Sequence, residues 1–198
     1  MSQGVCLVIG REDGHAWGVR VLLTLLAVGI VAGCQHRIQY PLVGQPGVVT
    51  LVGMHPHAVR PELWTMNYQQ DGFLPMCTPV VIESVTAREM RFVVPSIGVR
   101  FHYRVDDALA EPFTAHLDRM FGTQCPARAQ QLSMIDRDGI GRGVVQVGMS
   151  RLGVFFALGP PPAQATPSLD LPVWRYWRTR HSAFEVRFVG DVVSEVGH

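Results

Sequence analysis

An apolar segment near the start of the chain, residues 21–33, decides how much of the sequence is left to fold. Arg20 precedes it, and the small residues Val31-Ala32-Gly33 end it directly before Cys34. A basic residue, a short apolar run and a small-residue end are the parts of a secretory signal peptide. The run is too short to cross the ~30 Å hydrocarbon core as a helix. We therefore predict that residues 1–33 are a signal peptide.

The residues before this segment are unusual for a signal peptide. They form a long leader that contains Glu12 and Asp13, whereas such leaders are short and basic. We therefore expect the true start of translation to lie near Val19. Two alternatives remain for the apolar segment, namely an uncleaved anchor of a secreted protein and a helix buried in a core.

The end of the segment resembles the lipobox of bacterial lipoproteins, in which the cysteine thiol is acylated and becomes the new N-terminus. The resemblance implies that Cys34 is lipidated and that the mature chain is attached to a membrane through it. Gln35 follows the cysteine in place of an aspartate, which in such lipoproteins favours sorting to the outer membrane. The resemblance therefore implies a lipid anchor in the outer membrane, with the protein facing the periplasm of the cell envelope.

The remaining residues, 34–198, suffice for one domain or two small ones with a buried core. The whole chain has 17 basic and 16 acidic residues and a formal net charge of +1, which gives no strong attraction to a polyanion. We expect no nucleic-acid partner. The sequence contains no lysine, which also excludes the lysine-bearing phosphate loop of nucleotide-binding proteins.

Cys77 and Cys125 follow Cys34 in the sequence. In an oxidising periplasm two cysteines are a possible disulfide, which would stabilise the fold by about 4 kcal/mol in the chain-entropy model. The alternative is a pair of buried thiols that pack as small apolar groups. Spacing alone leaves both open.

No motif indicates a metal site. His55 and His57 flank a proline with no further ligand nearby, whereas structural metal sites use four. Residues 136–139 begin like a calcium loop, but Ile140 and Val147 occupy positions that need oxygen ligands. We expect an ordinary Asp/Gly turn there, with no metal and no cofactor.

No motif indicates an active site either. No serine or cysteine lies in a nucleophile motif such as G-x-S-x-G. His102 falls on the expected solvent face of a strand, and His116 is two residues from Asp118 on a helix, where such neighbours point apart. We predict that the protein is not an enzyme and has no catalytic residue.

Hydrophobic periodicity predicts an α+β fold with a β-rich first half. Residues 34–66 contain several prolines and one strand-like run at 48–52, so we expect a lipidated tether and an irregular segment. From 67 to 105 the pattern is β, with short strands at 78–85 and 90–94 and strict alternation at 99–105.

Residues 73–80 resemble the L-P-x-G-T-x-V entry of bacterial SH3-like modules, with Cys77 at the glycine position. This resemblance implies that residues 67–105 form a small antiparallel barrel or meander. Residues 106–144 should then hold a helix at 111–121, which Gly122 ends, followed by a connecting loop.

The last part of the chain, 145–198, has the clearest local signals. Ser150 is a favourable N-cap, and Gly159 with Pro160 ends the helix that follows. Strands are predicted at 174–177, 184–188 and 192–196. A glutamate in place of Gly153 would complete a capping box, so we expect Gly153→Glu to stabilise the helix.

The order G-M-[ST]-x-x-x-V…L-G-x-P, followed by W-x-Y and an alternating strand, resembles the SmpA/OmlA domain of BamE-like outer-membrane lipoproteins. The resemblance covers residues 145–196 and implies a helix on an antiparallel sheet (an αββ module). It also implies a role in protein interaction during outer-membrane assembly or envelope integrity.

Aromatic and basic residues of the strand at 174–177 are the candidate partner-binding site. Trp174 and Tyr176 share one face and Trp177 lies on the other, so one face packs and the other meets solvent. Tryptophan, tyrosine and arginine are the residues that dominate binding hot spots. The candidates are Trp174, Tyr176, Arg175, Arg178 and Arg180.

We therefore expect a protein-interaction module whose partners are envelope proteins or the cell-wall layer. One alternative is a cell-envelope hydrolase or cell-wall-modifying enzyme. The other is a periplasmic inhibitor or small-ligand-binding module.

We predict that Cys34→Ala abolishes fatty-acid labelling of the chain in its bacterial host, because the thiol is the acylated group. Metabolic labelling of wild type and variant measures this. Equal labelling of the two would exclude lipidation at Cys34.

Overall fold

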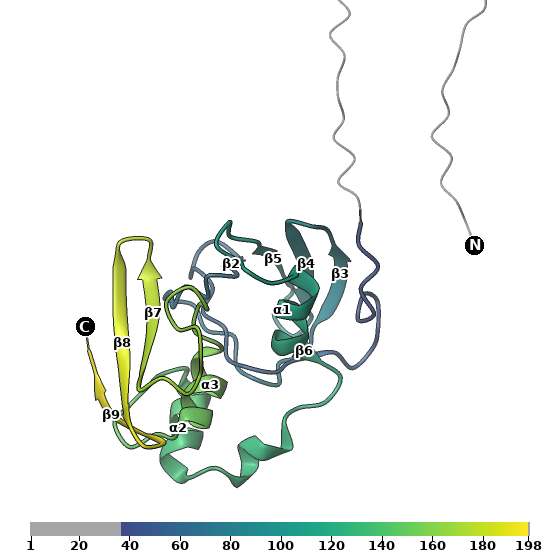
Figure 1. Cartoon of the computed structure of the whole chain (residues 1–198). Coiled ribbons are helices and arrows are strands. Elements are labelled where there is room, and N and C mark those ends of the chain that lie inside the picture. Colours follow the sequence, from purple (N-terminus) through teal and green to yellow (C-terminus); the bar gives the residue numbers. More distant parts are fainter. Residues whose placement is uncertain (1–36, 198) are drawn as a thin grey trace, which may run out of the picture. The chain divides into compact units, whose positions relative to one another are not determined.

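A four-stranded sheet occupies the first half of residues 37–197, the part of the chain that the computed structural model describes (Figure 1). The strand order is β2-β5-β4-β3, and the strands are β2 Glu62–Trp64, β5 Val99–Arg104, β4 Glu89–Val94 and β3 Val81–Val85. β2 runs parallel to β5, and the other neighbours are antiparallel. The predicted signal peptide and Cys34 lie outside the described residues.

Alternating side chains build the core on one face of this sheet. Phe92 of β4 and Phe101 of β5 are buried and stack with ring centroids 5.2 Å apart. Helix α1, Phe113–Met120, covers the same face, and its Leu117 is fully buried. The strands expected at 78–85, 90–94 and 99–105 and the helix expected at 111–121 are all present.

Residues 37–66 do not form a tether, which corrects the prediction for 34–66. Val48, Val52 and Met54 are 0 to 1 % exposed and belong to the core. β1, Val49–Thr50, pairs with β6, Phe121–Gly122. The prolines prevent long strands here, yet the backbone still bonds to the sheet edge. The prolines therefore keep residues 37–66 irregular, while the buried valines pack this segment into the core.

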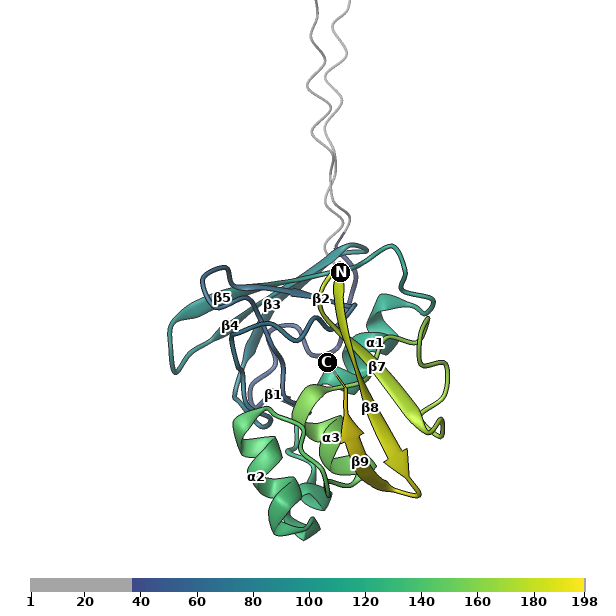
Figure 2. The same ribbon diagram turned by 90° about the vertical axis from the view of Figure 1, so that its left-hand side faces the viewer.

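The second half contains helices α2 Met134–Arg142 and α3 Arg151–Leu158 and an antiparallel sheet in the order β7-β8-β9. Its strands are β7 Val173–Thr179, β8 Ser182–Val189 and β9 Val192–Val196. A short 3-10 helix, Ala127–Gln131, precedes α2. Figure 2 shows α3 beside both α2 and this sheet. The predicted helix after Ser150 and the three predicted strands are confirmed.

Helix α2 replaces the predicted Asp/Gly turn at 136–139. Ser133 caps its start by accepting a hydrogen bond from the Asp136 N–H at 3.2 Å. Gly143 ends it with φ of 65°. Gly139 lies where α2 approaches the chain before α3, since a Cβ there would be 2.5 Å from Met149. Gly139, which predicts a turn, is in this case required for helix packing.

The Asp136 carboxylate caps α3 as well. Its Oδ1 accepts from the Ser150 backbone N–H at 2.7 Å, and its Oδ2 accepts from the Ser133 hydroxyl at 2.8 Å. Ser150 in turn accepts from the Gly153 N–H at 3.0 Å. The capping box that the sequence of α3 lacks is thus completed by an aspartate from α2.

Gly153 leaves the space that this carboxylate occupies. A Cβ at position 153 would lie 2.0 Å from Asp136 Oδ1. The expectation that Gly153→Glu stabilises the helix is therefore wrong, because a side chain there would displace the aspartate that already caps it.

The described residues all belong to one compact unit, and their buried apolar residues form one cluster. Residues 67–105 are not a separate module, because β2 comes from outside this range and joins the same sheet. The fold is α+β, as predicted.

A disulfide bond joins Cys77 and Cys125, whose Cα atoms are 5.2 Å apart. Cys77 lies before β3 with φ of 64°, in the left-handed region that favours glycine. Cys125 is exposed and lies between β6 and α2. The bond closes a loop that contains β3, β4, β5 and α1.

We predict that Gly153→Ala lowers the free energy of unfolding by about 1 to 3 kcal/mol, the usual cost of overpacking. Gly141→Ala is the matched control, because Gly141 is also helical but has open space at its Cβ. The control should leave stability unchanged or raise it by up to about 1 kcal/mol. Urea unfolding compares the variants, and equal midpoints for all three proteins would contradict the close contact.

Candidate functional site

Trp174 and Tyr176, two of the predicted partner-binding residues, are buried in the core. Their exposed fractions are 2 % and 0 %. The Tyr176 hydroxyl donates to the Gly159 carbonyl at 3.0 Å, and Trp174 Nε1–H donates to the Leu169 carbonyl at 3.1 Å. The prediction that these two rings bind a partner is wrong, because α3 and the loop after it cover this face of β7.

The arginines of this strand lie apart from one another. Arg175 is exposed and its guanidinium lies 5.5 Å from the ring centroid of Trp177, which is half-buried. Arg178 lies 4.5 Å from the centroid of Phe184. Arg180, in the turn between β7 and β8, lines a surface depression with residues from the first half of the chain. Only Arg180 of the predicted set takes part in the site described next.

This depression, of about 390 Å³, combines aromatic rings and arginines. We call its four central residues, Arg60, Trp64, Tyr68 and Arg180, the aromatic–arginine face. The other lining residues are His57, Glu62, Gln70 and Thr179. Trp64 and Tyr68 are half-buried, so part of each side chain is exposed in the depression.

Three local features hold the aromatic–arginine face in place. β2 carries Trp64 through its parallel pairing with β5. The His57 ring Nδ1 accepts from the Arg60 backbone N–H at 3.3 Å, which fixes the turn before β2. The Gln69 N–H donates to the Trp177 carbonyl at 2.7 Å and ties the loop after β2 to β7.

The face carries positive charge without a neutralising partner. Glu62 at its edge is already paired with Arg104 at 3.1 Å, and Arg104 lies 5.7 Å from the Trp64 centroid. Among residues 37–197, no carboxylate lies within ion-pair distance of Arg60 or Arg180. Burial and the charge of Asp106 raise the pKa of Tyr68, and the charge of Arg180 acts in the opposite direction.

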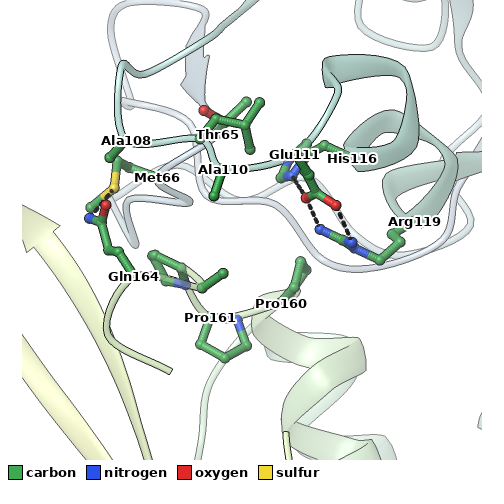
Figure 3. A pocket seen from close by; sticks show the side chains of 13 residues that line it. Thr65, Met66, Ala108, Ala110, Glu111, His116, Arg119, Pro160, Pro161 and Gln164 are labelled. Carbon is green, nitrogen blue, oxygen red and sulfur yellow. Dashed lines mark hydrogen bonds and ion pairs between the residues drawn. The ribbon is translucent and has the colours of Figure 1, made fainter. Parts of the chain in front are cut away.

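A second feature is a cavity of about 160 Å³ between α1 and the loop after α3 (Figure 3). Glu111 and Arg119 line one side, and Pro160 and Pro161 face them from the other. Arg119 donates two hydrogen bonds to the Glu111 carboxylate, one of them from Nη1 to Oε2 at 2.7 Å. Most of the other lining residues are alanine, leucine, proline or methionine, and the polar ones are Thr65, His116 and Gln164.

A chain of polar contacts leads from the core to this ion pair. The Tyr103 hydroxyl lies 2.7 Å from His116 Nε2, and His116 Nδ1 lies 3.4 Å from Glu111 Oε1. A carboxylate only accepts, so Nδ1 carries the proton and Tyr103 donates to Nε2. Burial raises the pKa of Tyr103, which keeps its hydroxyl protonated.

Burial also governs the charges of the other two groups. It lowers the pKa of His116 to about 4, and the Arg119 charge adds to this effect while Glu111 opposes it. Burial alone would raise the pKa of Glu111, but the hydrogen bond and charge of Arg119 lower it below its ordinary value. Near neutral pH the cavity therefore contains a neutral histidine and an ionised Glu111–Arg119 pair.

The polar groups around His116 are buried and paired with one another. Tyr103 is 1 % exposed, and both ring nitrogens of His116 already have partners. In the described part of the chain, no group of three His, Cys, Asp or Glu side chains could hold a metal. The cavity presents an arginine and an apolar surround, which is a binding surface.

Of the residues in these two features, only Arg180 was predicted from the sequence as a functional residue. His116 was compared only with Asp118, whereas its partners are Tyr103 on β5 and Glu111 before the helix. Neither motif spacing nor periodicity relates these positions.

Among residues 37–197, no helix is long and apolar enough to cross a membrane. Comparison with protein-family models, with curated proteins and with solved structures gave no match.

We predict that stability falls as the pH is lowered from about 6.5 toward 4, and that His116 contributes to the fall. In this range the unfolded chain binds a proton at His116 that the folded chain excludes, so the slope approaches about 1.4 kcal/mol per pH unit. Urea unfolding at several pH values measures it. His116→Gln should flatten the curve, and identical slopes for both proteins would contradict the buried neutral state.

Proposed function

We propose that the protein is a lipid-anchored lipoprotein of the outer membrane that binds another envelope protein in the periplasm through the aromatic–arginine face. The observation that carries the proposal is the pairing of two half-buried aromatic rings with two arginines that have no carboxylate partner in the described residues.

The chemistry of this face suits protein binding. Tryptophan, tyrosine and arginine supply most of the energy at protein interfaces, because large rings bury much area and guanidinium groups bind carboxylates with two hydrogen bonds. A partner that brings a carboxylate to Arg60 or Arg180 replaces water and restores charge balance. Its apolar atoms then cover Trp64 and Tyr68.

The anchor and the location are supported by the sequence. The signal-peptide pattern of residues 1–33, the lipobox-like end at Cys34 and Gln35 all favour an outer-membrane lipoprotein. Helix α3 beside the β7-β8-β9 sheet is compatible with the helix-plus-sheet unit of SmpA/OmlA domains that residues 145–196 resemble. We propose the kinship for this unit, and an SH3-like origin for strands β3 to β5.

We predict that Trp64→Ala and Arg180→Glu each weaken partner binding by about 30-fold or more, which corresponds to 2 kcal/mol. Matched controls are Trp177→Ala and Arg175→Glu, which change the same residue types outside the depression. The assay places a photo-crosslinking amino acid at Thr179 in the full-length protein in its host, and measures the yield of the dominant adduct.

The proposal requires the adduct to disappear in the two face variants and to persist in the two controls. Thermal melts show that each variant is folded. Equal adduct yields for face variants and controls would place the partner elsewhere on the surface.

A further inference from the structure

The cavity between α1 and the loop after α3 is separate from the aromatic–arginine face and has a different chemistry. We propose that it binds a short apolar group that ends in a carboxylate, and that Arg119 binds the carboxylate. This inference is independent of the proposed partner site.

The size and lining of the cavity fit a small apolar group. Its volume of about 160 Å³ is close to that of engineered apolar cavities, ~150 Å³, that take up benzene-sized molecules. Leu109, Met66 and the buried Pro160 and Pro161 form much of its lining. Proline side chains offer no donor and little freedom, so this wall is preformed and apolar.

Arg119 is the charged group of the lining that keeps unused donors. A guanidinium has five N–H donors, and the contact with Glu111 uses two of them. Its side chain is 45 % exposed, compared with 28 % for Glu111. Glu111 Oε1 is shared between Arg119 and His116, so the carboxylate is the more fully occupied member of the pair.

The chain Tyr103–His116–Glu111 explains why this arginine is held in place. Each group is fixed by the next, from the buried hydroxyl to the cavity wall. An arginine held in this way loses less side-chain entropy when a ligand binds. Glu111, His116 and Tyr103 are therefore positioning residues, and Arg119 is the binding residue.

A singly charged carboxylate fits the charge of the site better than the other ionic groups. A cationic ligand would face Arg119, and its only counter-charge, Glu111, is already occupied. A phosphate would find a single guanidinium and no second cation in the lining. A carboxylate needs one guanidinium edge, which is what Arg119 still offers.

The test is calorimetric titration of the full chain with 4-methylpentanoate and with its amide, which has the same apolar part and no charge. We expect the acid to bind at least about tenfold more tightly than the amide. A tripeptide that ends in leucine, with a free or an amidated C-terminus, distinguishes a peptide end from a free acid as the source of this group. Preference for either free carboxylate supports the proposal.

Variants separate binding from folding. Arg119→Gln should remove the preference for the acid, and Arg142→Gln, an exposed arginine paired with Asp138, should not. Glu111→Gln should tighten binding of the acid by freeing Arg119, whereas a purely structural ion pair would only lose stability. Ala110→Phe should block both ligands without changing any charge.

The proposal is overturned if neither ligand pair shows a preference for the free carboxylate, if no ligand binds at millimolar concentration, or if Arg119→Gln keeps the preference. Should Arg119→Gln fail to fold, Glu111→Gln decides alone, and unchanged or weaker binding of the acid in that variant excludes Arg119 as the binding group.

Discussion

A single buried carboxylate sets the arrangement of the second half of the molecule. Asp136 is 2 % exposed, lies in the first turn of α2 and accepts hydrogen bonds from both Ser133 and the backbone at Ser150. Negative charge is favourable at a helix start, and here one charge serves two starts. The two helices are thereby joined at their N-terminal ends, and α3 is placed so that Tyr176 can bond to Gly159.

Both candidate binding sites lie where the two halves of the described chain meet. Both the aromatic–arginine face and the Arg119 cavity combine residues from before α2 with residues from after α3. Each half supplies groups that its own core does not use: the first half brings charged and aromatic side chains, and the second brings Arg180 in a turn and a proline wall. Binding at either place would depend on the halves being packed together.

The sequence predicted the strands and the helix start that depend on interactions between neighbouring residues. Strict alternation located β5 and β7, and Ser150 located the start of α3, because these patterns act over a few residues. Helix α2 was missed since its glycines lower helix propensity, and only contact with Met149 makes Gly139 suitable. Alternation gave Trp174 and Tyr176 a common face but could not show that an irregular loop covers it. Tyr103 and His116 meet only through tertiary packing.

The disulfide has a consequence for resistance to proteolysis. It encloses β3, β4, β5 and α1 in a covalent ring, and Asp107 and Ala108 lie exposed inside that ring. Loop positions of this kind are where proteolytic nicking occurs. A cut there opens the ring without releasing either piece, because Cys77 and Cys125 still connect them. The nicked protein keeps the residues before the cut and the C-terminal sheet on one covalent molecule, so a cut in this exposed loop does not separate the two parts of the chain.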